Sequence, residues 1–148
     1  REDLFDLWVA ANQAGFATPN IDTLTDIVCC PGGDFCALAN AKSLPIADAI
    51  QQKFDDMDYV YDLGELSLNI SGCMNACAHH HVSDIGILGV DKKGEEFYQV
   101  MLGGNDGRNQ AAIGKVLGPA SGRDAIPGVI EKILHVFVGH RGDCESFG

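Results

Sequence analysis

The sequence predicts an α+β fold, in which a mixed, largely antiparallel sheet is flanked by helices. Some segments alternate apolar and polar residues, as half-buried strands do, and others repeat apolar residues at helical spacing. These segments do not follow the strict strand–helix alternation of a parallel α/β protein. Glycine-containing turns follow two of the predicted strands, and each turn carries a pair of cysteines. We therefore expect ligand-binding loops at the strand ends.

The first half of the chain is predicted to contain helices and one short strand. Residues 3–14 repeat apolar side chains at helical spacing and end before a glycine. Residues 16–22 form a connector, and the β-branched stretch 25–29 is a strand that leads into the first cysteine pair. Two helical pieces follow and are interrupted near Pro45: residues 37–42, and a second piece capped by Ser43 that runs to Phe54.

The second half is predicted to contain most of the sheet. Residues 65–70 alternate in polarity and run directly into the second cysteine pair. Two further strands, 85–90 and 97–102, form a hairpin around the turn 91–94. An extended segment at 113–117 precedes an amphipathic helix at 126–138, whose apolar side carries Val129, Ile130, Ile133, Leu134 and Phe137.

The composition is that of an ordinary globular domain, with 46% apolar and 21% charged residues over 148 positions. The net charge of −11 argues against nucleic acid and against anionic membrane surfaces as partners. No apolar run approaches the roughly 18 to 20 residues that a membrane span needs. The chain begins with Arg1 and shows no signal peptide, so we expect a piece of a longer, cytoplasmic protein.

The most distinctive feature is a set of two cysteine pairs. Five residues separate Cys30 from Cys36, three separate Cys73 from Cys77, and both pairs lie among Gly, Pro or Asn residues. Such segments let the backbone approach a bulky inorganic group, and four thiolates are what an iron–sulfur cluster requires. The five-residue gap is unusual for structural zinc, which favours two to four. Disulfides are the other alternative, although a chain of this length does not need such staples.

Other conspicuous residues have simpler interpretations. Cys29 and Cys144 fit small buried apolar side chains. The run of three histidines at 79–81 suggests a metal, but adjacent residues point in different directions, so we expect packing or hydrogen bonding instead. The loop 103–107 has glycines but lacks the lysine of a phosphate-binding loop, and it is predicted to be a turn.

Three stretches closely resemble the sulfite and nitrite reductase haemoprotein family: CPGGDFCALA (30–39), NISGCMNACAHHH (69–81) and IGILGV (85–90). The resemblance implies a 4Fe–4S cluster coupled to sirohaem. By position, the cluster ligands would be Cys30, Cys36, Cys73 and Cys77, and the last of these would also bridge to the sirohaem iron. Gly72 would leave room for the cofactors, and the amide of Asn75 would tune the potential. No catalytic side chain is assigned.

The function implied by the resemblance is six-electron reduction of sulfite to sulfide by an assimilatory sulfite reductase. Reduction of nitrite to ammonia by the same family is the alternative. The expected partners are sulfite or nitrite and an electron donor protein, either a flavoprotein or a ferredoxin. Two alternatives of another class stay open on the cysteines alone: a small iron–sulfur electron-transfer module, and a zinc or disulfide structural domain.

The chain also departs from the complete family pattern. Whole members are several times longer and are built from two related halves. Residues 1–24 resemble the tail of a ferredoxin-like segment that precedes the cluster domain, and residues 25–148 resemble the domain that binds the cluster and sirohaem. Cys29 stands where a small residue is usual, and Ala78 where glycine is frequent. The Lys and Arg residues are scattered, whereas an anion site needs clustered cations. We therefore expect the missing N-terminal half as a partner, and an isolated piece that is inactive and can lack either cofactor.

Overall fold

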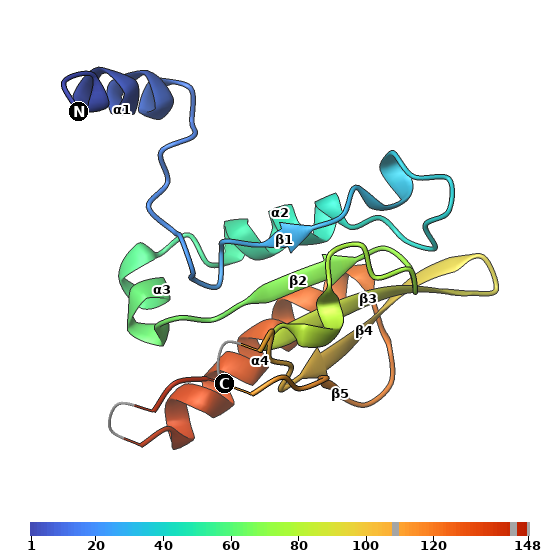
Figure 1. Cartoon of the computed structure of the whole chain (residues 1–148). Coiled ribbons are helices and arrows are strands. Elements are labelled where there is room, and N and C mark those ends of the chain that lie inside the picture. The colour runs from blue at the N-terminus through green and yellow to red at the C-terminus, as the bar shows by residue number, and fades with distance from the viewer. Residues whose placement is uncertain (108–109, 143–144, 148) are drawn as a thin grey trace.

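The computed structural model describes residues 1–107, 110–142 and 145–147, and it confirms the α+β expectation. One mixed sheet forms the body of the molecule, with helices packed against it (Figure 1). The α-helices are α1 (Leu4–Gln13), α2 (Leu44–Lys53), α3 (Met57–Leu63) and α4 (Ile126–His140). The strands are β1 (Val28–Cys29), β2 (Leu68–Ser71), β3 (Ile85–Lys92), β4 (Glu95–Leu102), β5 (Lys115–Val116) and β6 (Ser121–Gly122). Short 3-10 turns are η1 (Gly32–Asp34), η2 (His80–Val82) and η3 (Arg123–Ala125).

The sheet has a parallel half and an antiparallel half. Its order is β1-β2-β3-β4-β5, with β6 also paired to β4. The two pairings β1–β2 and β2–β3 are parallel, and the other three are antiparallel. Because β1 and β2 run side by side in the same direction, the loops that follow them leave the sheet at the same edge. Those two loops carry the two cysteine pairs.

The hydrophobic core lies between one face of the sheet and the helices α2 and α4, which also contact each other. The apolar stripe predicted for residues 126–138 is the buried side of α4. Alternate residues of β2 and β3 point into the same core, as the strand period of two requires. The fully buried members from these four elements are Ile46, Ile50, Leu68, Ile70, Ile85, Ile87, Ile126, Ile130 and Leu134.

The opposite face of the sheet is covered by the loop that follows β2. Asn69 points to this side and donates from Nδ2 to the carbonyl of Ala78, at 2.9 Å. Gly86 of β3 lies directly under the same loop, and a Cβ there would come within 1.9 Å of the His80 carbonyl oxygen. The second cysteine pair is therefore held against the sheet by close backbone packing.

Several local predictions were wrong in instructive ways. Residues 37–42 are not helical, because the N–H groups of Asn40 and Ala41 donate to the distant Gly72 carbonyl. The helix α3 was missed, although Asp56 marks its start by accepting from the N–H groups of Asp58 and Tyr59. The strand predicted at 65–70 begins later, at Leu68. The short strand β6 was also missed.

Other predictions were accurate. The hairpin has longer strands than expected and turns at Lys93 and Gly94, whose φ values are +61° and +85°. Both values are positive, as a two-residue turn between twisted strands requires. The helix at 3–14 forms as α1, and the extended segment at 113–117 contains β5. Among the described residues, no helix has both the length and the apolar character needed to cross a bilayer.

Helix α1 stands apart from the body and is joined to it by an extended segment (Figure 1). None of its residues is buried, although it carries the apolar side chains Leu4, Phe5, Leu7 and Trp8. The connector touches the body where the Tyr61 hydroxyl donates to the Pro19 carbonyl. The chain enters the core shortly afterwards, at Leu24, which is fully buried.

The packing of α4 yields a first testable prediction. Ile130→Ala removes a side chain that is 0% exposed, so it should lower the free energy of unfolding by about 2–5 kcal/mol through lost burial and a residual cavity. Val136→Ala lies on the same helix at a position 61% exposed, and should change that free energy by less than about 1 kcal/mol. Urea unfolding of both variants measures the difference. Equal effects would mean that α4 does not pack as described.

Candidate functional site

The two cysteine pairs meet at one cavity. Cys30, Cys36, Cys73 and Cys77 all line it, together with Asn75, and its volume is about 100 Å³. Cys73 is buried, Cys30 and Cys36 are half-buried, and Cys77 is exposed. The rest of the lining is almost wholly apolar and consists of Pro31, Leu38, Ala39 and Ser71. Residues predicted from spacing alone are thus brought together from two segments that are distant in the sequence.

The first cysteine segment leaves the sheet at the end of β1. The N–H of Cys30 donates to the Ile70 carbonyl at 3.1 Å, which extends the parallel pairing by one residue. The chain then turns through η1, where the N–H of Cys36 donates to the Gly32 carbonyl at 2.9 Å. This tight turn brings Cys36 back toward Cys30 across the five intervening residues.

The second segment leaves the sheet at the end of β2 and is compact. The N–H of Ala76 donates to the Cys73 carbonyl at 3.2 Å, and Ala76 has a left-handed φ of +55°. The N–H of Ala78 donates to the Ser71 hydroxyl at 3.3 Å. This turn places Cys73 and Cys77 on the same cavity and leaves Asn75 at its lining.

Gly72 joins the two segments. Its carbonyl accepts from the N–H groups of Asn40 and Ala41 at 2.9 and 3.0 Å, and its own N–H donates to Cys30 Sγ at 3.1 Å. A Cβ at Gly72 would lie 2.7 Å from the Ala41 carbonyl oxygen and 2.9 Å from the Gly32 Cα. The sequence suggested that Gly72 leaves space for cofactors. In the structure Gly72 is not among the residues that line the cavity, and its missing side chain lets two stretches of backbone touch.

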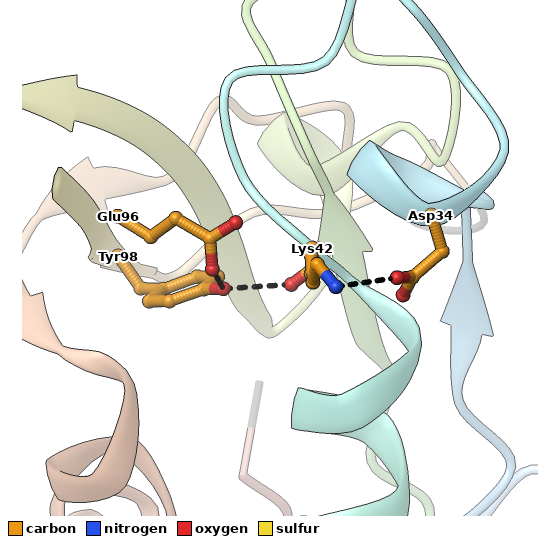
Figure 2. A network of polar contacts seen from close by, with 4 residues as sticks. All are labelled: Asp34, Lys42, Glu96 and Tyr98. Carbon is orange, nitrogen blue, oxygen red and sulfur yellow. Dashed lines mark hydrogen bonds and ion pairs between the residues drawn. The ribbon is translucent and has the colours of Figure 1, made fainter. Parts of the chain in front are cut away.

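A polar network fastens the first cysteine segment to the sheet (Figure 2). The Tyr98 hydroxyl, on β4, donates to the Lys42 carbonyl at 2.7 Å and contacts the Glu96 carboxylate at 3.2 Å. The Lys42 ammonium forms an ion pair with Asp34 at 2.8 Å. Burial, and then the nearby Glu96 carboxylate, raise the pKa of Tyr98, so it stays a neutral donor. Sequence reasoning missed this network because its members come from separate elements.

The position of Ser43 was predicted correctly, but the partner of its side chain was not. It was predicted to cap the following helix, and it does stand at the N-cap of α2, but its side chain makes no capping hydrogen bond. Its hydroxyl lies instead 3.5 Å from Cys30 Sγ. A serine two residues before a proline gave no sequence signal for this contact.

The four thiols of the cavity come from two different loops. Within the described part of the chain, no three His, Cys, Asp or Glu side chains are grouped closely enough to hold a single metal ion. The five cysteines that the structure describes all carry free thiols. This arrangement of sulfurs around a cavity suits a multi-atom inorganic group better than one zinc ion.

Cys29 lies beside the site without lining the cavity. It is half-buried, and its Sγ donates to the Cys30 carbonyl at 3.2 Å. Burial, and then the neighbouring Cys30, raise the pKa of Cys29 to about 12. The thiol is therefore protonated at neutral pH, in agreement with its interpretation as a small buried residue. Cys144 lies outside the described residues.

The three adjacent histidines have different surroundings. His79 is exposed with a left-handed φ of +54°, whereas the His80 side chain is buried and stacks on His81 at 4.0 Å between ring centroids. Neither ring nitrogen of His80 has a hydrogen-bond partner in the structure. Burial, and then His81, lower the pKa of His80 to about 4. Of the two expected roles, packing or hydrogen bonding, the burial and stacking of His80 fit packing.

A larger cleft of about 610 Å³ lies away from the cysteines, around His79. No lysine, arginine or cysteine is among its described lining residues. Five carboxylates do line it: Asp22, Asp26, Glu65, Asp84 and Asp106. Size alone would favour this cleft as the functional site. The smaller cavity is lined by four cysteine thiols, which are the side chains that can bind an iron–sulfur group, and it is therefore the candidate site.

Residues 20–145 match the family described as nitrite and sulphite reductase 4Fe-4S domain. The chain belongs to this family. Because the match covers most of the chain and includes both cysteine pairs, the reductase resemblance noted in the sequence is confirmed. The loop 103–107 also falls inside this match. In the structure it is irregular, apart from an isolated β-bridge between Asn105 and Ala112.

Individual relatives of this reductase domain include both sulfite and nitrite enzymes. The chain is 30% identical to sulfite reductase [ferredoxin] 2 of Mycolicibacterium paratuberculosis, over 99% of the chain and 28% of the relative. It is 27% identical to the assimilatory ferredoxin-dependent nitrite reductase of Haloferax mediterranei, over 81% of the chain and 21% of the relative. The solved structure of the Mycobacterium tuberculosis NirA protein superposes with a TM-score of 0.80 at 27% identity, covering 99% of this chain and 28% of that one. The chain thus spans about a quarter of the length of these relatives.

The contact at Gly72 yields a second prediction. Gly72→Ala forces a Cβ into the Ala41 carbonyl and the Gly32 backbone, so unfolding should become easier by about 1–3 kcal/mol. Gly128→Ala in α4 is the matched control, because a Cβ there meets nothing within 4 Å, and alanine favours a helix by up to about 1 kcal/mol. Thermal unfolding distinguishes the two variants. If both behaved alike, the close approach at Gly72 would not exist in solution.

The buried His80 yields a third prediction, on pH. Its folded pKa of about 4 lies below the usual 6.5, so between these values the unfolded chain binds more protons than the folded one. Stability should therefore fall as the pH drops from about 6.5 to about 4, by up to about 3 kcal/mol from this group.

His80→Phe should remove this part of the pH dependence, whereas His79→Asn, at an exposed left-handed position, should retain it. Urea unfolding at a series of pH values gives the slopes. A slope unchanged in His80→Phe would show that other groups, such as carboxylates, account for the whole effect.

Proposed function

We propose that this chain is the cluster-binding part of an assimilatory reductase that carries out the six-electron reduction of sulfite to sulfide. The observation that carries the proposal is the convergence of Cys30, Cys36, Cys73 and Cys77 on one cavity. Membership of the nitrite and sulphite reductase family supports it. The piece alone is proposed to be inactive, with no catalytic side chain of its own.

The residues at the cavity fit a 4Fe–4S cluster. Its four ligands would be the four cysteines of the lining, in keeping with the cysteine ligation of such clusters. The N–H of Gly72 already points at Cys30 Sγ, a hydrogen bond that suits a thiolate better than a thiol. Asn75 also lines the cavity, where its amide is placed to interact with the cluster.

The fit to sirohaem is partial. Large apolar side chains stand exposed at this site and suit an apolar macrocycle. Leu38 lines the cavity and is 71% exposed, and Phe35 and Met74, next in sequence to Cys36 and Cys73, are 79% and 81% exposed. No lysine or arginine lies among the described lining residues, so the carboxylates of sirohaem would have to be neutralised elsewhere. We propose that the missing N-terminal half supplies those cations. The two groups together would supply electrons and the iron that binds the anion, with Cys77 as the shared ligand.

Sulfite is proposed as the substrate, with nitrite as the alternative. Among the relatives, sulfite reductases and nitrite reductases both occur, some named as ferredoxin-dependent and one, from Bacillus subtilis, as an NAD(P)H enzyme. We therefore propose a ferredoxin or a flavoprotein as the electron donor. Assays of the complete enzyme with sulfite and with nitrite distinguish the two substrates, and a visible spectrum distinguishes a sirohaem enzyme from a plain iron–sulfur carrier.

The domain division proposed from the sequence separates residues 1–24, as the tail of a preceding segment, from the cluster domain 25–148. Two observations support a boundary in this region: α1 buries none of its residues, and the family match begins at residue 20. A cluster held by thiolates requires reduced cysteines, which favours a cytoplasmic location.

A fourth prediction tests the ligand set. In the complete reductase, Cys77→Ser should lower activity by at least about 100-fold with an artificial electron donor, because a hydroxyl is a poor substitute for a bridging thiolate. Iron content should fall as well. Cys29→Ser should keep the iron and cost only about 0.5–3 kcal/mol of stability, as a conservative change at a half-buried position.

Measurements of activity, iron and sulfide on both variants show whether Cys77 or Cys29 is a ligand. Equal loss in the two would move the first ligand to Cys29, and full activity in Cys77→Ser would remove Cys77 from the site.

A further inference from the structure

Ser43 is placed to act on the sulfur of the first proposed ligand. Its side chain is 0% exposed, and its hydroxyl lies 3.5 Å from Cys30 Sγ. Within the described residues this is the hydroxyl's only hydrogen-bond contact, since the side chain takes no part in capping α2. A thiolate that binds iron has no proton, so the hydroxyl would be the donor in the loaded protein.

The same sulfur receives a second donor. The N–H of Gly72 points at Cys30 Sγ from 3.1 Å, while Ser43 approaches from α2. Two protein groups therefore point at Cys30 Sγ, one from the backbone and one from a side chain. For the other described cysteines of the cavity, no hydrogen bond to the sulfur is found.

The position of the hydroxyl is fixed by its surroundings. A Cβ on Gly32 would lie 2.7 Å from Ser43 Oγ, and one on Gly72 would lie 2.9 Å from it. The backbone of Ser43 is held too, because its carbonyl accepts from the N–H groups of Ile46 and Ala47, both at 3.1 Å. The hydroxyl thus occupies a slot between two glycines and has little freedom to turn away from the sulfur.

Reduction adds negative charge to an iron–sulfur cluster, and part of that charge resides on the sulfurs. A donor aimed at a ligand sulfur stabilises the reduced state more than the oxidised state, and so raises the reduction potential. A buried donor acts more strongly than one in contact with water, because the local dielectric constant is low. Ser43 meets these conditions, being buried, oriented and adjacent to a ligand.

We propose that Ser43 raises the reduction potential of the cluster through a hydrogen bond to Cys30 Sγ, without being needed to hold the cluster. This inference rests on the proposed cluster ligation. It assigns to Ser43 an electronic role that a merely structural hydroxyl would not have.

The fifth prediction tests this role in the complete reductase. Ser43→Ala should retain its iron and sulfide, and its cluster midpoint potential, from a redox titration followed by electron paramagnetic resonance, should fall. A change on the order of tenfold in the reduction equilibrium is expected, which is about 59 mV for a one-electron couple. Ser43→Cys keeps a weak S–H donor and should give an intermediate potential.

Ser83→Ala is the matched control. Ser83 is also buried, but its hydroxyl contacts the carbonyl oxygens of His80 and Ile85 instead of a thiol. It should leave the potential unchanged, even where it lowers stability.

Each outcome decides the proposal. An intact cluster with an unchanged potential in Ser43→Ala would overturn it, and so would loss of the cluster from both Ser43 variants, since Ser43 would then be structural. An equal shift in Ser83→Ala would show a general effect of loosened packing and would also contradict it. If the unaltered protein carried no cluster at all, the proposed function itself would fail, which iron and sulfide analysis reveals separately.

Discussion

The site depends on one backbone contact, in which the Gly72 carbonyl accepts from the N–H groups of Asn40 and Ala41. This contact brings together two loops that leave adjacent parallel strands, and it exists only because residue 72 has no side chain. Each loop contributes two cysteines, so neither loop alone forms the cavity. The Tyr98 and Lys42 contacts then anchor the first loop to the antiparallel half of the sheet. The stability of the fold and the geometry of the thiols are therefore linked through the same few hydrogen bonds.

The parallel and antiparallel halves of the sheet have different roles. Because β1, β2 and β3 pair in parallel, both cysteine segments leave the sheet at the same edge. The long β3–β4 hairpin pairs two strands that are consecutive in the sequence. Helices α2 and α4 cover one face with purely apolar side chains. The other face meets the second cysteine loop through polar groups such as Asn69 and Ser71. The apolar core lies on one face of the sheet, and the hydrogen-bonded cysteine loop lies on the other. The site is therefore attached to the sheet without being part of the hydrophobic core.

The sequence predictions succeeded where the structure depends on residues close in sequence and failed where it depends on distant ones. The hairpin, α2 and α4 were predicted because residues close in sequence determine them, and the cysteine pairs because their spacing is chemically specific. Residues 37–42 were assigned wrongly, since their backbone hydrogen bonds go to a distant glycine that composition cannot reveal. Ser43 looked like a helix cap, and only the three-dimensional position of Cys30 shows its other partner. Asp56, in contrast, was a readable signal for α3 that was overlooked.

The detached helix α1 has a practical consequence for handling this protein. Phe5 and Trp8 contact each other on a surface that faces water, and Phe16 and Ile21 along the connector are 85% and 79% exposed. Apolar area of this kind promotes self-association at the concentrations used for spectroscopy and crystal growth. A shortened version starting at Pro19 would lose α1 and the exposed Phe16. It would keep Asn20 and Asp22, whose carbonyls accept from the N–H groups of Thr23 and Leu66. Such a trimmed protein is the better starting material for anaerobic cluster reconstitution.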